Sequence, residues 1–453
     1  MITTTSRPVL GQRSISRRGL LGGVAAVAAG AGLAACQPGS SARPGQQVAP
    51  SGDGGAAGYD GPPVELAFWN GLTGGDGPIM KKMCDNFTKE YPNVKISTTT
   101  IAWADYYQKL PAAVSNGKGP DVGMMHADTL ATNAARQVVQ PLDDVANALG
   151  MTEEDFTPIV WQAGMYNGQR YGLPLDLHPA GLYYNKRVME KVGADPDSPP
   201  TNMDEFMNVL DMAKSKGVQG LWVPPGAVAN NFGQTMVYQF GGHMVDEAGT
   251  TSGYNHPGTV AAMQWVRSLI DEGYSPKNAA NDSDTLALQN DKTVFMFNGP
   301  WMVTPLKENK KVDWGVTQVP NIGGTLATWS GSHQFVLPVQ RSADENKTKA
   351  ARAFVNWIIQ NSLAWADAGM VPARASVREM PEFAEKEEVN IFAQQLDYVR
   401  FLPPVPGISD IATEWATATS NIVAGKKGVQ EALDEAAQKA NRILAENQKK
   451  YQR

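Results

Sequence analysis

The chain has 453 residues, of which 39 are Lys or Arg and 45 are Asp or Glu, giving a formal net charge of −6. This balance does not favour nucleic acid or anionic lipid headgroups as partners. The length beyond the N-terminal region exceeds what one hydrophobic core usually accommodates, so we expect two lobes.

The N-terminus predicts an export signal. An apolar run from Leu20 to Ala35 is too short to span a bilayer comfortably and fits the core of a signal peptide. The pair Arg17-Arg18 before this run is typical of a twin-arginine signal, and the run ends at Cys36 in the pattern of a lipoprotein cleavage site. We expect residues 1–35 to be removed and Cys36 to be lipidated. An ordinary Sec signal and an unmodified Cys36 are the alternatives.

Residues 37–63 consist mostly of Gly, Ala, Ser, Pro and Gln and have no apolar periodicity, which predicts a flexible tether. Removal of residues 1–35 takes away four arginines and no acidic residue, so 35 basic and 45 acidic residues remain and the net charge becomes −10. We expect the mature protein outside the cytoplasm, anchored to the outer face of the cytoplasmic membrane through lipidated Cys36.

The next segment predicts an α/β lobe. Strands are expected at 64–69, 94–101 and 121–125, with helices near 79–91 and 103–114 between them. The order β-α-β-α-β calls for a largely parallel sheet covered by helices. Ligands gather beyond the carboxyl ends of such strands, which places the loops at Asn70 and at His126 to Asp128 near one mouth.

Cys84 lies on the apolar face of the first of these helices, so we interpret it as a buried structural thiol. If Cys36 carries lipid, Cys84 is the only other thiol and no internal disulfide can form.

The middle of the chain, residues 182–321, predicts a second α/β lobe. Helices are expected at 203–216, 258–272 and 284–290, with Thr201 or Asn202 as the N-cap of the first. Late helices at 347–363 and 429–444 carry apolar stripes at helical spacing, which indicates core packing.

Enzymatic motifs are weak in this sequence. None of the five histidines belongs to a His-Glu-x-x-His zinc motif, and Ser330 to His333 lacks the elbow that exposes a serine nucleophile. The pair Asp143-Asp144 fits the N-terminus of a helix better than the two catalytic carboxylates of a glycosidase. We therefore expect no catalytic residue, no cofactor and no metal, because neither a His nor a Cys cluster is present along the chain.

Aromatic residues beside turn residues are a stronger signal. A sugar presents a polar rim and an apolar C–H face, so its site needs Trp or Tyr planes with polar groups at their edges. Such pairs occur at Trp69-Asn70, Trp222, Asn298 to Trp301, Trp329 to Gly331 and Glu414-Trp415.

The order of several motifs resembles the extracellular solute-binding proteins of sugar ABC transporters, related to the maltose-binding proteins. The resemblance runs from about Val64 to Lys450. The motifs are Phe68-Trp69-Asn70-Gly71, Gly119-Pro120-Asp121-Val122 followed by His126-Ala127-Asp128, Tyr171-Gly172-Leu173-Pro174, Leu182-Tyr183-Tyr184-Asn185-Lys186, Asn298-Gly299-Pro300-Trp301, and Trp415 with the long final helix.

This resemblance implies a two-lobed periplasmic-binding-protein-like α/β fold whose hinge the chain crosses three times, near 175–178, 328–331 and 373–377. It divides the chain into a signal peptide (1–35), a tether (36–61), an N-terminal lobe (62–176 plus 329–375) and a C-terminal lobe (177–328 plus 376–453).

The matching motifs imply sugar contacts at Asn70, Asp128, Trp301 and Trp415. His178 occupies a hinge position where the maltose binders have an acidic residue, and Met125 stands where they have Trp, which puts maltose itself in doubt. His178 is a candidate ligand residue by this hinge position. Chemistry and motif neighbourhood add Asp176, Trp222, Trp329 and Arg374, with a structural ion pair as the alternative for Arg374.

The implied activity is capture of a mono- or oligosaccharide without catalysis and its delivery to ABC permease subunits in the membrane. One rival is a secreted lipid-anchored carbohydrate-active enzyme with an aromatic cleft. A second rival is the same fold binding a peptide, polyamine, phosphodiester or metal.

Overall fold

The structure is a computed structural model that describes residues 58–451. The predicted signal peptide, its arginine pair, Cys36 and most of the predicted tether lie outside the described residues. Within residues 58–451, no helix combines the length and the apolar character needed to cross a bilayer.

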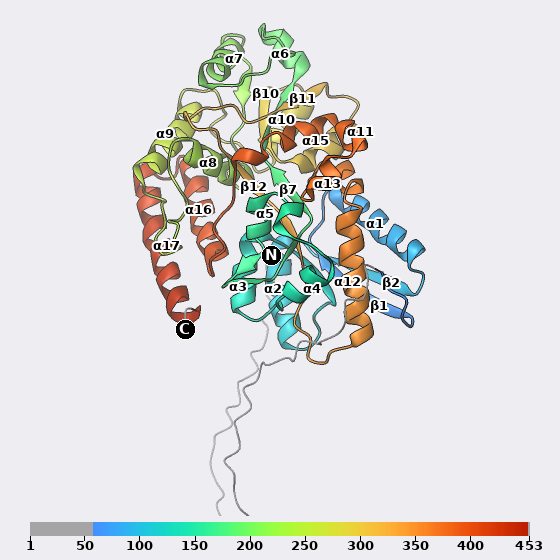
Figure 1. Cartoon of the computed structure of the whole chain (residues 1–453). Coiled ribbons are helices and arrows are strands. Elements are labelled where there is room, and N and C mark those ends of the chain that lie inside the picture. The colour runs from blue at the N-terminus through green and yellow to red at the C-terminus, as the bar shows by residue number, and fades with distance from the viewer. Residues whose placement is uncertain (1–57, 452–453) are drawn as a thin grey trace, which may run out of the picture. The chain divides into compact units, whose positions relative to one another are not determined.

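The first lobe is built on a five-stranded sheet of order β2-β1-β3-β13-β6 (Figure 1). Its strands are β1 (Val64–Asn70), β2 (Val94–Thr100), β3 (Val122–His126), β6 (Leu173–Pro174) and β13 (His333–Val336). Leu66 and Phe68 are buried while their neighbours on β1 are more exposed, as the alternating sequence requires. The strands β2, β1 and β3 are parallel, as predicted, whereas β13 runs antiparallel to β3 and β6.

Helices cover this sheet and close the core of the first lobe. They are α1 (Asp76–Glu90), α2 (Trp103–Ser115), α3 (Ala127–Ala135), α4 (Asp143–Ala148), α5 (Pro158–Gln162) and α12 (Glu345–Gln360), with the short 3₁₀ helix η1 (Glu153–Asp155) and the hairpin β4 (Met165–Tyr166) and β5 (Gln169–Arg170). Phe354 of α12 contacts Phe68 and Phe87 edge-on, with ring centroids 5.4 and 5.2 Å away. Cys84 is 4% exposed and burial raises its pKa to about 12, which confirms the structural thiol.

The second lobe has a four-stranded sheet of order β11-β8-β10-β9. Its strands are β8 (Gly181–Asn185), β9 (Gln219–Leu221), β10 (Thr293–Asn298) and β11 (Trp314–Thr317). Its helices are α6 (Lys186–Val192), α7 (Met203–Ser215), α8 (Ala227–Gln239), α9 (Pro257–Asp271), α10 (Ser283–Gln289), η2 (Pro300–Met302) and α11 (Val303–Glu308). Asn202 caps α7, accepting from the backbone N–H of Glu205 at 3.1 Å, as predicted.

A third sheet, of order β14-β7-β12-β15, lies where the chain passes between the lobes. Its strands are β7 (Asp176–Pro179), β12 (Thr328–Gly331), β14 (Val371–Pro372) and β15 (Val399–Arg400). β7 directly follows β6 of the first sheet and precedes β8 of the second, and β12 leads from β11 back to β13. The predicted two-lobed α/β architecture with hinge crossings is confirmed, while the lobe boundaries in residue numbers stay a prediction.

The C-terminal region contributes to both lobes. It contains η3 (Ala364–Ala368), whose Trp365 lies in the core of the first lobe, and then α13 (Ala375–Arg378), α14 (Pro381–Ala384), α15 (Glu387–Ala393), η4 (Leu396–Tyr398), α16 (Ile408–Val423) and α17 (Val429–Tyr451). The last two helices complete the core of the second lobe. Leu433, Ala436 and Ala440 of α17 are buried, which confirms the predicted core stripe. The chain at the start of α16 also contacts the first lobe, because the backbone N–H of Gly407 donates to Thr132 Oγ1 on α3 at 2.9 Å.

The end of the predicted tether belongs to the folded part of the chain. Tyr59 is 6% exposed in the core of the first lobe, and its hydroxyl donates to the carbonyl of Pro62 at 2.7 Å. The compositional prediction therefore extended the tether too far, since one aromatic side chain is enough to fix a glycine-rich segment on a hydrophobic surface.

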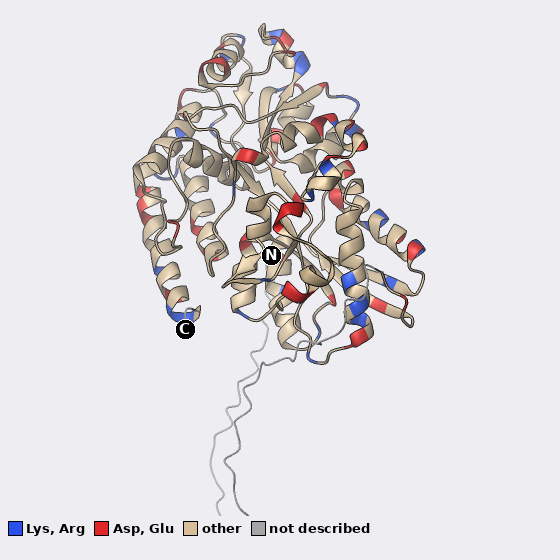
Figure 2. Ribbon diagram, viewed as in Figure 1, with Lys and Arg blue, Asp and Glu red and all other residues tan. Residues whose placement is uncertain are grey.

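Charged residues are interspersed along the outer helices in the view of Figure 2. In this view α12 carries basic and acidic residues close together, and Lys347 of that helix pairs with Asp121 at 3.0 Å. In this view, charges of both signs are mixed, and no large patch of one sign offers a site for a highly charged partner.

Candidate functional site

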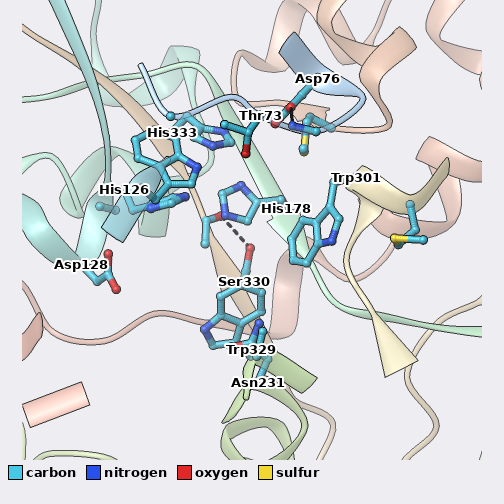
Figure 3. Close-up of a pocket in the computed structure, with 18 of the residues that line it drawn as sticks. Thr73, Asp76, His126, Asp128, His178, Asn231, Trp301, Trp329, Ser330 and His333 are labelled. Atoms are coloured by element: carbon cyan, nitrogen blue, oxygen red, sulfur yellow. Dashed lines mark hydrogen bonds between the residues drawn. The ribbon is translucent and has the colours of Figure 1, made fainter. Parts of the chain in front are cut away.

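A pocket of about 530 Å³ lies between the two lobes at the hinge strands. Figure 3 shows polar and aromatic side chains converging on it from both lobes. The first lobe contributes Thr73, Asp76, Trp103, His126, Asp128 and His333; the hinge strands contribute His178, Trp329, Ser330 and Gly331; and the second lobe contributes Ala227, Asn231, Trp301 and Met302.

The loop after β1 shapes one wall of the pocket. Gly71 is required there, because a Cβ on this residue would lie 2.1 Å from Cδ2 of the Trp103 indole. The ring of Trp103 therefore lies over the loop, with its centroid 4.3 Å from that of His126 and 5.7 Å from that of His333. A glycine in the loop thus allows the indole at the start of α2 to reach the pocket.

Two more indoles form the opposite wall. Trp301 and Trp329 lie edge to face, with centroids 6.4 Å apart and planes at 79°. Each centroid is also 6.0 Å from the imidazole of His178. Trp301 belongs to the second lobe but packs against the hydrophobic core of the first, so it bridges the cleft. Indole faces at an angle suit ligands that present C–H surfaces on more than one side.

A second hollow of about 460 Å³ adjoins this pocket. The two share Ala227, Asn231, Trp301, Met302 and Trp329, while Asp282, Thr285, Leu286 and Asn298 line only the second. Leu286 is 62% exposed, which is unusual for a large apolar side chain. The binding space therefore extends past the two indoles into the second lobe.

Three histidines gather on the floor of the pocket. The ring centroids of His178 and His333 are 4.8 Å apart, those of His126 and His333 are 5.1 Å apart, and those of His126 and His178 are 5.8 Å apart. Asp176 lies beneath them, fully buried, and its carboxylate accepts from Nδ1 of His333 at 2.7 Å and of His178 at 3.3 Å.

The electrostatics of this cluster follow from burial and from one carboxylate. Burial lowers the pKa of His126 well below its ordinary value and also lowers the pKa of His178, although the hydrogen bond to Asp176 opposes the second shift. Burial alone would lower the pKa of His333, but the charge of Asp176 outweighs it and raises that pKa. Burial alone would likewise raise the pKa of Asp176, yet the charge of His333 holds it well below its usual range. His126 and His178 are therefore neutral near pH 7, beside an ionised Asp176.

Asp128 adds a second buried carboxyl group to the pocket wall. It lies in the first turn of α3, where backbone N–H groups of that turn favour the ionised form. Desolvation is the larger effect and raises the pKa of Asp128 to about 6. This carboxyl can therefore either accept or donate hydrogen bonds in a mildly acidic medium.

Of the predicted ligand residues, the structure brings Asp128, His178, Trp301 and Trp329 to the pocket wall. Asp176 lies below the wall and acts on the histidines instead of facing the cavity. Asn70 is 1% exposed, and its Oδ1 accepts from the backbone N–H of Leu72 at 3.2 Å, so it fixes the loop after β1. Whether the lining residues contact a ligand stays a prediction.

Three predicted ligand residues lie elsewhere. Trp415 is fully buried in the core of the second lobe, where its Nε1–H donates to the carbonyl of Asn230 at 3.2 Å, so its assignment as a sugar platform is wrong. Arg374 pairs with Asp155 at 3.4 Å, which is the structural alternative left open for it. Trp222 is partly buried and does not line the pocket. Trp415 was expected beside a turn at the end of an element, but it lies in the middle of α16, where its side chain faces the core.

Trp103, His126 and His333 line the pocket but were not predicted as ligand residues. The prediction that the chain has no histidine cluster is wrong for the folded protein, where His178 and His333 lie together with Asp176. His126 ends β3 and His333 begins β13, and the two lie opposite each other in the sheet, but no local feature of the sequence encodes this pairing. The serines beside His333 donate to backbone carbonyls, Ser330 to Gly331 at 3.0 Å and Ser332 to His333 at 3.4 Å, so the geometry gives no support to a serine nucleophile.

Comparison with known proteins gives consistent matches. Residues 82–391 match the family described as bacterial extracellular solute-binding protein. A putative binding protein of Brucella abortus is 25% identical over 379 residues, covering 81% of this chain and 90% of the relative. A maltotriose-binding protein of Pyrococcus abyssi is 23% identical over 382 residues, covering 82% of this chain and 77% of the relative.

Among solved structures, the fold is similar to that of the GacH receptor of Streptomyces glaucescens, which is known unliganded and in complex with acarbose. The TM-score is 0.75 at 21% identity, over 84% of this chain and 98% of that chain. At this identity the likeness concerns the fold, and it agrees with the two lobes and the hinge sheet described above.

Proposed function

The chain belongs to the family of bacterial extracellular solute-binding proteins, and we propose that it captures a carbohydrate between its lobes and delivers it to an ABC permease. The single observation that carries this proposal is the pocket at the hinge, where Trp103, Trp301 and Trp329 meet polar groups from both lobes. Indole planes bordered by carboxylates and imidazoles suit the apolar faces and polar rims of sugar rings.

The extent of the binding space favours an oligosaccharide over a single sugar. The two adjoining hollows are separated by Trp301 and Trp329, so one ring can lie over the histidines while the next lies beside Leu286. In this proposal Asp128 and Asn231 hydrogen-bond the sugar hydroxyls from opposite lobes. We infer a ligand other than maltose, because His178 and Met125 stand where the maltose binders have an acidic residue and Trp.

We propose that the two lobes close on the ligand. The first lobe comprises residues 62–176 and 329–375, and the second comprises residues 177–328 and 376–453. A ligand can contact Asp128 and Trp301 together only when the lobes are close, so it favours the closed form. The lobes already approach closely at one point, because a Cβ on Gly75 of the first lobe would lie 3.2 Å from Cβ of Thr304 on α11. We propose that the closed form docks on the permease and that no bond of the solute is made or broken.

The location follows from the N-terminal sequence. We propose that the chain is exported through its twin-arginine signal, cleaved before Cys36 and held on the outer face of the cytoplasmic membrane by a diacyl group. A tether of about 20 residues would then keep the lobes within reach of the permease and raise their local concentration there. Metabolic labelling with a fatty acid, compared between the wild type and Cys36→Ala, tests the anchor; equal labelling would contradict it.

The ligand proposal is tested by isothermal titration calorimetry with a panel of monosaccharides and of α- and β-linked di- and trisaccharides. At least one oligosaccharide should bind more tightly than its component monosaccharides. If chromatography detects slow hydrolysis of the bound sugar, this result would support the alternative of a carbohydrate-active enzyme. Absence of binding across the panel, with tight binding of a non-sugar solute co-purified from the source, would overturn the carbohydrate assignment.

A further inference from the structure

We propose that His126, His178 and His333 form a binding site for a divalent transition-metal cation of the Zn²⁺ class, with Asp176 orienting two of the three imidazoles. This site goes beyond the proposed carbohydrate binding, because the cation is a second ligand that needs no sugar.

The spacing of the rings fits a shared cation. Zn–N bonds are about 2.0–2.1 Å long, so three imidazoles bound to one cation in tetrahedral geometry have ring centroids roughly 5 Å apart. The three centroid distances here are 4.8, 5.1 and 5.8 Å. Ligating atoms of His178, of His333 and of the Asp176 carboxylate lie within 4.8 Å of one another, and His126 enters the site by its ring-centroid distances to these two histidines.

The hydrogen bonds leave the same nitrogen available on each ring. Nδ1 of His126 is engaged by the hydroxyl of Tyr107 at 2.8 Å, and Nδ1 of His178 and of His333 by Asp176. Nε2 therefore remains as the ligating atom of each ring. A metal-bound imidazole that donates its other N–H to a carboxylate is the usual outer-shell arrangement of zinc sites.

Asp176 is saturated by its own donors. Its Oδ1 accepts from the backbone N–H of His333 at 2.8 Å and from His178, and its Oδ2 accepts from Nδ1 of His333 and from Nε1 of Trp365 at 2.7 Å. Four donors occupy the lone pairs of the carboxylate, so it orients the rings instead of binding the cation directly.

The site is reachable from the pocket. All three histidines line the pocket wall. Gly331 lies opposite His178, and a Cβ there would lie 2.1 Å from Nε2, so only a glycine leaves that nitrogen free of a side chain. Nitrogen ligands select Zn²⁺, Co²⁺, Ni²⁺ or Cu²⁺ over Mg²⁺ and Ca²⁺. Three protein ligands leave one coordination position for water or for an oxygen of a solute.

The test uses the full-length protein without a polyhistidine tag, stripped with a chelator and titrated with Zn²⁺ by calorimetry and with Co²⁺ by visible absorption. No sugar is present, so the result does not depend on the carbohydrate proposal. We expect one equivalent of either cation to bind, with Co²⁺ bands of four-coordinate geometry, and neither Mg²⁺ nor Ca²⁺ to compete. Absence of saturable binding would overturn the proposal.

Variants distinguish this site from adventitious binding. His178→Gln, His333→Gln and His126→Gln should each weaken Zn²⁺ binding by at least about tenfold. His126→Gln is the decisive variant, because its ring makes no hydrogen bond to Asp176 and a loss of affinity there does not follow from disturbing that carboxylate. The matched control is His243→Gln, since the rings of His243 and His256 also lie 4.8 Å apart but outside the pocket. Binding that is lost in His243→Gln and kept in the three pocket variants would refute the assignment.

Discussion

The imidazole of His333 donates from Nδ1 to Oδ2 of Asp176 across 2.7 Å, with both side chains almost completely buried. His333 begins β13 of the first lobe and Asp176 begins the hinge strand β7. The contact therefore joins the sheet of the first lobe to the strand on which the second lobe turns. A charge buried at a hinge is costly unless every lone pair is satisfied, and here four donors satisfy it.

Replacing Asp176 by Asn should destabilise the fold by about 3 kcal/mol, because an amide N–H₂ then faces hydrogen-bond donors in a fully buried site. The measurement is urea unfolding followed by tryptophan fluorescence. Asp85→Asn is the control, since that side chain is exposed on α1 and forms an ordinary surface pair with Lys81. An unchanged midpoint for Asp176→Asn would show that the buried pair contributes nothing to stability.

Trp301→Ala should weaken binding of the best oligosaccharide of the panel by about 100-fold, because stacking on a partly buried indole contributes a few kcal/mol to binding. Trp222→Ala is the matched comparison. It removes another partly buried indole of the second lobe, but one that does not line the pocket, so affinity should stay within about twofold. Calorimetry on both variants checks this, and equal losses would contradict the assignment of Trp301.

Much of the fold could be predicted because the signals are local. The alternation of β1, the apolar face of α1 and the Asn202 cap of α7 each depend on a few neighbouring residues. The antiparallel strand β13 could not be predicted, because its partner β3 lies about 200 residues away and nothing in His333 to Val336 encodes the direction of pairing.

The site was harder to predict because it forms only when distant segments meet. Trp301 and Trp329 were found because glycine and serine beside an indole mark a turn. Trp103 begins a helix at a position typical of a core residue. Its ring reaches the pocket only because Gly71 has no side chain to occupy the same space. The histidine cluster joins positions 126, 178 and 333, and no spacing rule connects them.

Gly75→Leu should hinder closure. Gly75 has φ −63°, so a side chain is tolerated by the backbone, but its Cβ would lie 3.2 Å from Thr304 Cβ and 3.3 Å from Pro305 Cδ in the other lobe. The added side chain separates the lobes, and affinity should fall at least about tenfold, or 1.4 kcal/mol. Small-angle scattering should show a smaller ligand-induced compaction than in the wild type. Gly428→Leu, with no neighbouring atom within 4 Å, is the control.

Trp415→Ala should destabilise the second lobe by about 3–5 kcal/mol, because a fully buried indole leaves a large cavity. Its ring packs on that of Tyr254, with centroids 5.4 Å apart, and it does not line the pocket. Calorimetric unfolding should therefore show a lower midpoint, while sugar affinity at a temperature where the variant is folded stays unchanged. Lost affinity with unchanged stability would restore Trp415 as a ligand residue.

Because Asp284 is buried, we expect the stability of the protein to depend on pH. This carboxyl lies in the first turn of α10, fully buried, and burial raises its pKa to about 6 from 3.8. Between these two values the folded protein holds a proton that the unfolded chain has lost, so stability falls as the pH rises through this window. Above about pH 6 the full cost of ionising this buried carboxyl, about 3 kcal/mol, destabilises the folded state.

Asp284→Asn should remove this cost, because the amide resembles the neutral acid and does not ionise. The variant should exceed the wild type in stability by about 3 kcal/mol at pH 7.5, and the gain should shrink at pH 5 and approach zero near pH 4. Urea unfolding at the three pH values measures the difference. Asp204→Asn, at the exposed start of α7, should show no such trend. A gain independent of pH would mean that packing of the amide, and not the lost ionisation, stabilises the variant.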